Sequence, residues 1–233
     1  MTTMFCVGNS HLAAVAKGAS IADIPVLALA MRHKLAKHKE GELGEAFWAK
    51  ISEEVATRKP TRIFAFIGGG TPAMLGLLRH SEPFDFVLPD APTLPLSEGS
   101  TVLPYDAVRA IASAHMRRHF RRLNRLAALG VPVVQCETPP PVPDNGFLAR
   151  HVAQTHPEVD VASISPPAMR YKIWRLHSQL FEQFCKSRQI GYARNPPEVA
   201  DADGFLKQEY WGDIVHGNAR YGAAVLRQLK ELA

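Results

Sequence analysis

Five short apolar runs are spaced along the chain, and segments with helical periodicity separate them. The runs are apolar throughout rather than alternating with polar residues, which is typical of strands buried on both faces of a parallel sheet. They cover residues 4–7, 25–30, 63–67, 131–136 and 190–193. Apolar residues recur at helical spacing in the segments between and after them, at residues 12–17, 43–58, 72–79, 105–129, 168–187 and 216–232. This alternation predicts an open α/β sheet with helices on both faces.

The length and composition of the chain are those of one soluble globular domain, which we expect to span residues 1–233. Hydrophobic residues make up 46% of the sequence and charged residues 21%. No apolar run approaches the ~20 residues that cross a bilayer, and the N-terminus lacks a signal-peptide pattern. Cys6, Cys136 and Cys185 form an odd set without framework spacing, so we expect them to be free and buried. These features favour a cytoplasmic protein.

The net charge of +5 is concentrated in one segment, residues 115–125. The helical pattern there predicts that the arginines lie mostly opposite the apolar stripe, as a solvated basic face. They are Arg117, Arg118, Arg121, Arg122 and Arg125. No recognised nucleic-acid module accompanies them, so a nucleic-acid partner is not expected.

Turn-forming residues follow three of the predicted strands. The sequence reads GNSH at residues 8–11, GGG at 68–70 and TPPP at 138–141. In an open α/β sheet, ligands bind beyond the carboxyl ends of the strands. We therefore expect the three stretches to converge on one rim. A long proline-rich and acidic connection, residues 81–104, is a further candidate for a functional loop.

Ser10 is a candidate nucleophile if a base removes its proton. Asp213 and His216 lie three residues apart near the C-terminus. In a turn leading into a helix, that spacing places both side chains on one side, so that the carboxylate orients the imidazole. The alternative is that Ser10 and Asp213 simply cap helices.

These two motifs together resemble the SGNH/GDSL hydrolase family. The match consists of GNSH at residues 8–11 and DIVHGNARYG at 213–222, which includes Asn218 and Tyr221 as support for the last helix. The resemblance covers most of the chain and implies a three-layer, flavodoxin-like fold and ester hydrolysis. It implies that Ser10 is the nucleophile, His216 the general base and Asp213 the residue that orients His216.

The resemblance also implies an oxyanion hole with three donors. These are the Ser10 backbone N–H, a glycine N–H that we assign to Gly41, with Gly44 as the alternative, and an asparagine side chain. Gly70 stands where that asparagine is expected. Losing one such donor typically lowers turnover ~100- to 1000-fold. The backbone N–H of Gly70 or Thr71, or the Thr71 hydroxyl, is a possible substitute.

Other polar residues near these motifs have local explanations. Asn9, His11 and Thr71 are candidate pocket residues, with a structural role as the alternative for His11. The sequence at 68–72 fits a glycine turn in which Thr71 caps a helix and Pro72 is its first residue. It lacks the Gly-Lys-Ser/Thr signature of a phosphate loop.

The pattern therefore predicts a serine hydrolase for a small-molecule ester with a small or carbohydrate-linked acyl group. No metal, organic cofactor or membrane is expected to take part. His115 and His119 share a helix face, but no third metal ligand is evident. The rival prediction is a weak or inactive binding protein of the same fold, because Gly70 replaces the asparagine. The sequence does not predict an oligomeric state.

Overall fold

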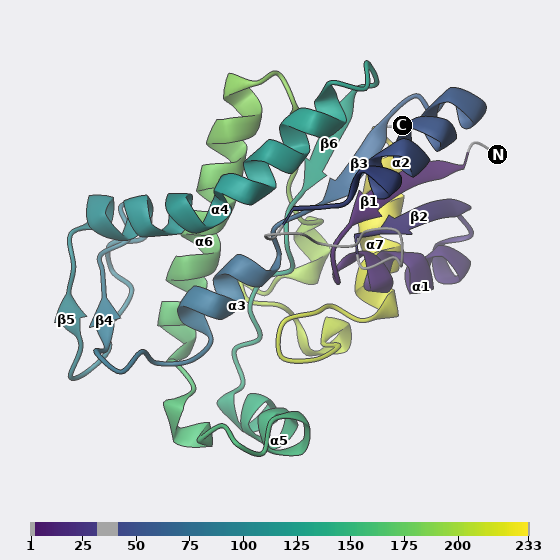
Figure 1. Ribbon diagram of the computed structural model, residues 1–233. Coiled ribbons are helices and arrows are strands. Elements are labelled where there is room, and N and C mark those ends of the chain that lie inside the picture. The colour runs from purple at the N-terminus through teal and green to yellow at the C-terminus, as the bar shows by residue number, and fades with distance from the viewer. Residues whose placement is uncertain (1–2, 32–41, 233) are drawn as a thin grey trace.

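Five parallel strands form the central sheet of the computed structural model, which describes residues 3–31 and 42–232 (Figure 1). Their spatial order is β2-β1-β3-β6-β7, and neighbouring strands pair in parallel. The bounds are β1 Met4–Gly8, β2 Val26–Ala30, β3 Ile63–Phe66, β6 Val133–Cys136 and β7 Gly191–Ala193. This is the strand order of flavodoxin-like folds. The predicted fold class is confirmed.

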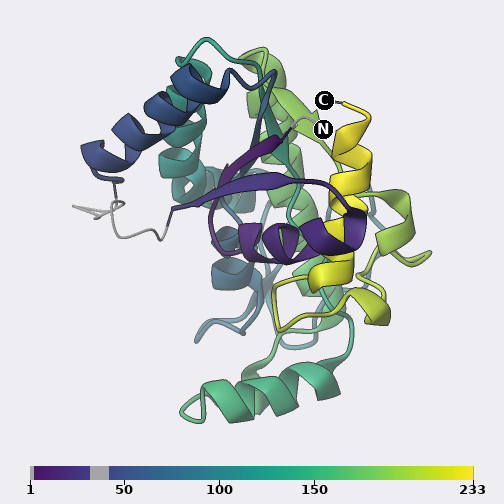
Figure 2. The same ribbon diagram turned by 90° about the vertical axis from the view of Figure 1, so that its right-hand side faces the viewer.

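Helices cover both faces of the sheet, which gives three layers (Figures 1 and 2). One face packs against α2 (Glu45–Arg58), α4 (Tyr105–Ala127) and α6 (Pro167–Ser187). The other packs against α1 (Leu12–Ala22) and α7 (Ala219–Lys230). The short helix α3 (Gly70–Gly76) follows β3, and α5 (Asn145–Thr155) lies further from the sheet. Three 3₁₀ turns complete the connections, at Val161–Ser163, Pro197–Val199 and Gln208–Tyr210.

The two cores explain why the strand sequences are apolar throughout. Successive side chains of a strand point to opposite faces. In β1, Phe5 and Val7 belong to the core under α2, α4 and α6, whereas Met4 and Cys6 belong to the core under α1 and α7. All five residues of β1 are buried. The three cysteines are free and buried, as predicted.

One helix and one pair of short strands were not predicted from the sequence. Helix α5 follows a proline-rich loop, and the Asp144 side chain caps it by accepting from the Phe147 amide at 2.9 Å. The connection at 81–104 contains a two-stranded parallel pair, β4 (Phe84–Asp85) and β5 (Thr101–Val102). Strands of two residues carry too little periodicity to be recognised in sequence.

Three predictions about helix ends and faces were wrong. The last helix begins at Ala219, and Asn218 rather than Asp213 caps it. Helix α3 begins at Gly70, with Gly69 as the N-cap residue, so Thr71 does not cap it. Arg122 is only 5% exposed and therefore does not belong to the solvated face of α4.

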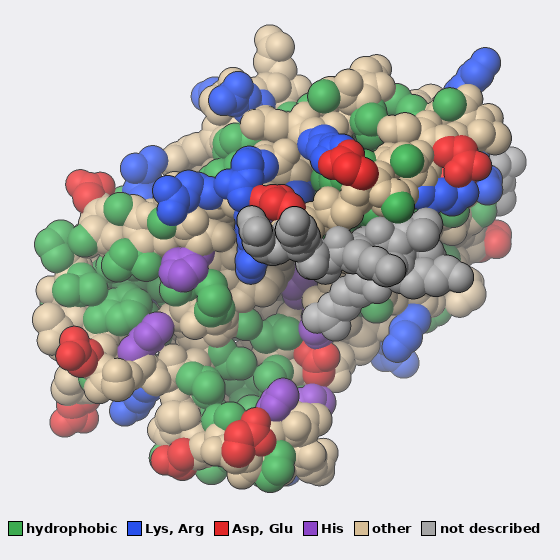
Figure 3. Space-filling model, in the orientation of Figure 1, with side chains coloured by type: hydrophobic (Ala, Val, Ile, Leu, Met, Phe, Trp, Pro, Cys, Tyr) green, Lys and Arg blue, Asp and Glu red, His purple; other side chains and the backbone are tan. Residues whose placement is uncertain are grey.

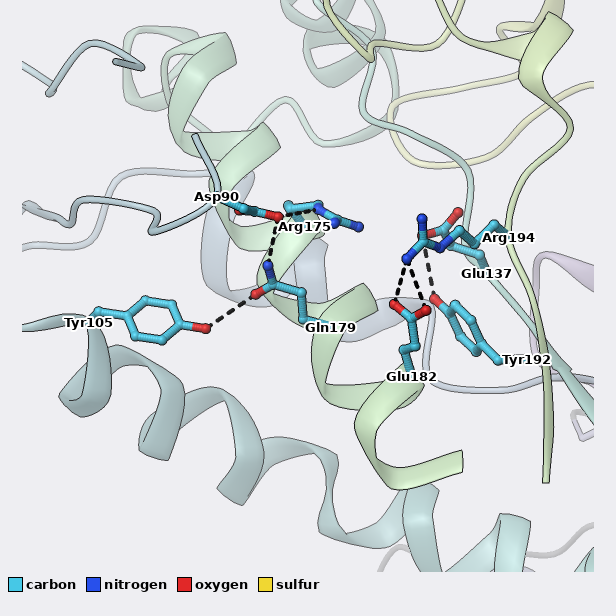
Figure 4. Close-up of polar contacts among 8 residues, drawn as sticks. All are labelled: Asp90, Tyr105, Glu137, Arg175, Gln179, Glu182, Tyr192 and Arg194. Carbon is cyan, nitrogen blue, oxygen red and sulfur yellow. Dashed lines mark hydrogen bonds and ion pairs between the residues drawn. The ribbon is translucent and has the colours of Figure 1, made fainter. Parts of the chain in front are cut away.

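Helix α6 is held by polar contacts along its length (Figure 4). Asp90 of the long connection accepts from Arg175 at 2.9 Å and from Gln179 at 2.8 Å. Further along the helix, Glu182 pairs with Arg194, which follows β7, through two contacts of 2.9 Å. These contacts fix α6 between the 81–104 connection and the edge of the sheet.

Helices α1 and α7 cross closely at two glycines. A Cβ on Gly222 would lie 2.0 Å from the Ala14 carbonyl oxygen, and a Cβ on Gly18 would lie 2.3 Å from the Ala223 nitrogen. No real side chain approaches backbone so closely. Because Ser10 precedes α1 and His216 precedes α7, this crossing fixes the two ends of the chain relative to each other.

We expect Gly222→Ala to destabilise the protein by about 2 kcal/mol, although alanine favours helix over glycine. The added methyl group meets the backbone of α1, which has no room to move without opening the core. Urea unfolding measures the change. The matched control is Gly70→Ala, where a Cβ has no neighbour within 4 Å; equal effects of the two substitutions would contradict the close crossing.

No helix in the described part of the chain is long and apolar enough to cross a membrane.

Candidate active site

Ser10 lies in the turn between β1 and α1, at the carboxyl edge of the sheet. The turn is closed by the Leu12 amide, which donates to the Asn9 carbonyl at 3.1 Å. His11, not Ser10, is the N-cap residue of α1, and no side chain caps this helix. Within the described residues the Ser10 hydroxyl has no hydrogen-bond partner. The helix-cap alternative for Ser10 is therefore wrong, and the hydroxyl is left available.

Asp213 and His216 form a tight turn just before α7. The Asp213 carboxylate accepts from the amides of Val215 and His216, at 2.9 and 2.8 Å. It also contacts His216 Nδ1 at 2.7 Å. The turn thus holds the imidazole with Nδ1 against the carboxylate and Nε2 pointing away from it. Nε2 is buried and has no partner among the described residues.

The electrostatics of this pair suit an orienting carboxylate. Burial alone raises the pKa of Asp213, but hydrogen bonds from His216 and the Val215 amide outweigh it and lower the pKa to about 2. The carboxylate therefore stays ionised at neutral pH. An ionised partner fixes the tautomer that carries its proton on Nδ1, which leaves Nε2 as an acceptor.

Ser10, Asp213 and His216 line the same cavity, of about 750 Å³, together with Asn9. The structure does not record a hydrogen bond between Ser10 and His216. Catalytic hydrogen bonds are often long in empty sites and tighten when substrate binds. The two ends of the chain, more than 200 residues apart, thus meet at one edge of the sheet.

The turn after β3 lies beside the turn that carries Ser10. The Gly68 amide donates to the Asn9 side chain at 3.4 Å, and the Asn9 amide donates to the Phe66 carbonyl at 2.9 Å. Gly68 has a φ of 90°, which L-residues with side chains rarely adopt. Its carbonyl accepts from His177 Nε2 at 3.1 Å.

A second, smaller pocket of about 40 Å³ opens next to these turns, and we call it the proline pocket. Its apolar walls include Pro72, Leu77, Pro139, Pro140, Pro141 and Trp174. Its polar lining residues are His11, Thr138 and Arg170. Figure 3 shows hydrophobic side chains in a hollow on this face of the molecule. All three predicted rim stretches contribute to this site, because parallel strands end at the same edge of the sheet.

Known structures with the same architecture are found in several bacteria, at low sequence identity. The periplasmic domain of a lipopolysaccharide acetyltransferase from Salmonella ser. Paratyphi A is 9% identical, with a TM-score of 0.55 over 99% of this chain and 83% of that one. A candidate SGNH hydrolase from Slackia heliotrinireducens is 14% identical, with a TM-score of 0.50 over 97% of each chain. A candidate acylhydrolase from Bacteroides fragilis is 10% identical, with a TM-score of 0.50 over 99% of this chain and 86% of that one. The sequence matches no family model and no curated protein.

The chain has the SGNH hydrolase fold. The sequence departs from the expected pattern at position 70, where glycine stands in place of the expected asparagine. Gly70 is exposed and is the first residue of α3, and a Cβ there would meet nothing within 4 Å. A side chain at this position would therefore meet no clash at its Cβ.

The other predicted oxyanion and pocket residues have mixed outcomes. Gly41 lies outside the described residues, and Gly44 is the N-cap residue of α2. Thr71 is buried, and its amide donates to the Gly68 carbonyl at 3.2 Å. Asn9 lines the cavity with Ser10, and His11 lines the proline pocket.

Arg170 and Trp174 line the proline pocket and were not predicted from the sequence. Both residues belong to α6. Arg170 donates to the carbonyls of Val142 and Pro143, at 2.8 and 3.1 Å, and so holds the loop after β6. Trp174 Nε1 donates to the Thr138 carbonyl at 3.1 Å. A charged residue on the apolar stripe of a predicted helix was the available signal, because Arg170 lies three and four residues before Ile173 and Trp174.

Proposed function

We propose that this protein hydrolyses an ester of a small acyl group through an acyl-enzyme on Ser10. The observation that carries the proposal is the Asp213–His216 pair, which lines the same cavity as Ser10 and whose Nε2 has no hydrogen-bond partner among the described residues. A carboxylate, an imidazole and a hydroxyl at one cavity are the three groups that activate a serine nucleophile.

In the first half of the reaction, His216 Nε2 takes the proton from Ser10 Oγ as the oxygen attacks the ester carbonyl carbon. The carbonyl double bond opens to an oxyanion. The oxyanion then collapses and expels the alcohol, which leaves with the proton from His216. In the second half, water loses a proton to Nε2, attacks the acyl-serine and releases the acid, and Ser10 recovers its proton.

The oxyanion would form at the N-terminal end of α1. The first backbone N–H groups of a helix lack intrahelical acceptors, and the helix dipole favours negative charge there. Ser10 lies two residues before the first residue of this 11-residue helix, next to the N-cap residue His11. It can therefore supply one oxyanion donor without any side chain.

The proline pocket supports a short acyl group. Its volume of about 40 Å³ corresponds to only a few water-sized positions. Pro139, Pro140 and Trp174 border it, and prolines have little freedom to widen a pocket. We therefore propose acetyl, or an acyl group of similar size, as the part of the ester that enters it. The acetyltransferase with the same fold acts with an acyl group of that size, which agrees with this choice.

The test is hydrolysis of p-nitrophenyl acetate, butyrate and octanoate by the wild-type protein, with a fluorophosphonate label located by peptide mass. We expect label on Ser10 and a kcat/KM for acetate at least tenfold above that for octanoate. The label is expected to be absent from folded Ser10→Ala protein. Equal rates for all three esters would contradict the small-acyl proposal alone.

The second candidate is a binding protein that keeps the fold and the cavity. The absence of a side chain at Gly70 favours it, since a missing oxyanion donor weakens catalysis. This candidate predicts no turnover and no label on Ser10 in folded protein, together with saturable binding of a small ester or its acid.

A further inference from the structure

His11 follows the proposed nucleophile and is the most unusual side chain in the site. It is only 4% exposed, and neither of its ring nitrogens has a hydrogen-bond partner within the described residues. An unpaired polar group that is shielded from water destabilises a folded protein. Such a group calls for a partner, and at the proposed active site the substrate can supply one.

The position of the ring is set by two neighbours. A Cβ on Gly69 would lie 1.8 Å from His11 Cδ2 and 1.9 Å from Nε2, so the ring occupies the space that a side chain at position 69 would need. On the other side, the centre of the His11 ring is 4.7 Å from the centre of the His216 ring. The His11 imidazole thus lies between the general base and the turn that should carry the missing asparagine.

The ring also borders the proline pocket, together with Gly69 and Val215. A carbonyl whose acyl group enters this pocket, and whose carbon is attacked by Ser10, has to pass beside His11. Its oxygen must point toward hydrogen-bond donors near the Ser10 amide. Gly70 contributes no side chain there.

The protonation state of His11 suits a neutral donor. Burial, with a further contribution from His216, lowers the pKa of His11 to about 4. A polar contact with the Gly69 backbone opposes this shift. The other charged group that faces the ring is Asp213, which also opposes the shift and remains ionised above about pH 4. His11 is therefore neutral near pH 7, with one ring N–H to donate.

We propose that the ring N–H of His11 is an oxyanion donor that substitutes for the asparagine side chain absent at Gly70. This inference rests on the proposed ester hydrolysis at Ser10. It makes His11 a catalytic residue in contact with the reacting oxygen. Histidine side chains are among the groups that can fill this role.

Because the His11 ring has no hydrogen-bond partner in the described part of the chain before the reaction, a bond that it forms to the oxyanion would stabilise only the transition state and the intermediate. Among the described residues the His11 ring nitrogens find no hydrogen-bond partner, whereas in the tetrahedral intermediate the ring N–H gains a charged acceptor. Only interactions that are stronger in the transition state than in the ground state accelerate the chemical step. Because the donor is already buried, little reorganisation opposes the new bond.

Two other buried histidines lie near the same turn and provide a comparison. His177 donates to the Gly68 carbonyl, so one of its nitrogens is engaged. His119 of α4 packs beside Gly68 and is 5% exposed, but it does not line the proline pocket. His119 is thus the matched control for a histidine that is buried close to the site without reaching the reacting atoms.

The experiment replaces the ring with groups that do or do not donate. We expect His11→Phe, which fills the space without an N–H, to lower kcat about 100- to 1000-fold with KM within about threefold. His11→Gln, which keeps a donor at a similar reach, should stay within about tenfold of wild type. His119→Phe should leave kcat within about threefold. Thermal melting checks that each variant is folded; His11→Met replaces His11→Phe if the latter does not fold.

A second substitution tests whether His11→Phe lowers kcat because the N–H donor is lost or because the shape of the site has changed. Adding Gly70→Asn to His11→Phe supplies an amide at a position where a Cβ has no neighbour within 4 Å, and it should raise kcat at least tenfold. The proposal is overturned if His11→Phe turns over like wild type while Ser10→Ala is inactive. It is also overturned if His11→Gln loses as much as His11→Phe, or if Gly70→Asn restores nothing. A wild-type protein without turnover or label on Ser10 would instead contradict the proposed function itself.

Discussion

Replacing Ser10 or His216 with alanine is expected to lower kcat for p-nitrophenyl acetate by about 10⁴- to 10⁶-fold, and replacing both is expected to cost little more than either alone. The reason is that the two groups act as a unit. Without His216 the Ser10 hydroxyl keeps its proton and is a poor nucleophile, and without Ser10 the base has nothing to activate except water. The measurement is steady-state hydrolysis by the two single variants and the double variant.

Asp213 is the third residue of the proposed catalytic set, and its replacement is also expected to lower activity. Asp213→Asn keeps the size of the side chain but lets an amide face His216 Nδ1, which favours the wrong tautomer. We expect a loss that approaches those of the other two variants, together with a loosened turn, because Asp213 also accepts from two backbone amides.

The matched control for the serine is Ser20→Ala, on the exposed face of α1, where the hydroxyl only contacts the Lys17 carbonyl. Its kcat should equal that of wild type. Independent losses at Ser10 and His216, whose product describes the double variant, would contradict a shared mechanism. Appreciable turnover by Ser10→Ala would remove Ser10 from the reaction altogether.

Replacing Lys172 with methionine is expected to destabilise the protein by about 3–5 kcal/mol. Lys172 on α6 and Asp85 on β4 are both fully buried, and Nζ lies 2.8 Å from the carboxylate. Lys172 also donates to the Pro95 carbonyl at 2.9 Å. The carboxylate accepts from the amides of Phe86 and Ser97, each at 2.7 Å. Without the lysine, a carboxylate stays buried without its opposite charge.

The comparison is made by urea unfolding at pH 7. The control is Lys50→Met on α2, which breaks pairs with Glu53 and Glu54 at the surface and should change stability far less than Lys172→Met does. Removing both buried charges, with Lys172→Met and Asp85→Leu together, should recover part of the loss, because no uncompensated charge then remains. Equal effects of Lys172→Met and Lys50→Met would contradict the importance of burial.

The buried Lys172–Asp85 pair also predicts that the stability of the protein depends on pH. Burial alone raises the pKa of Asp85, but hydrogen bonds from Lys172 and from Ser97 and Phe86 outweigh it, so the net shift is downward. A carboxyl with a lowered folded-state pKa contributes stability above its unfolded value of about 4, and this contribution is lost as the pH falls through the folded-state pKa. The difference in unfolding free energy between wild type and Lys172→Met should therefore become smaller below about pH 4.

The buried pair also shows why the 81–104 connection was only partly understood from the sequence. Its prolines and acidic residues indicated a loop, and most of it is irregular. The partner of Asp85 lies 87 residues away. No local pattern specifies such a pair, because a lysine and an aspartate in sequence look equally suited to solvent.

The surroundings of Arg122 and His11 likewise depend on distant segments and could not be read from local sequence patterns. Arg122 was assigned to a solvated face from the periodicity of its own helix, yet it is only 5% exposed in the folded protein. From the sequence, His11 was a candidate pocket residue at the start of a helix, with a structural role as the alternative. Its unpaired nitrogens and its contact with His216 exist only after the two ends of the chain meet.

The sequence by itself determined the order of strands and helices and the two motifs at Ser10 and at Asp213–His216, since hydrophobic periodicity and turn chemistry are local properties. It also identified Gly70 as the departure from the expected pattern. The tertiary structure decided that three loops share one edge of the sheet, that α6 brings Arg170 and Trp174 to a small pocket, and that His11 lies against Gly69 and His216. These features depend on contacts between distant segments, which the parallel sheet and the close crossing of α1 with α7 create only when the chain is folded.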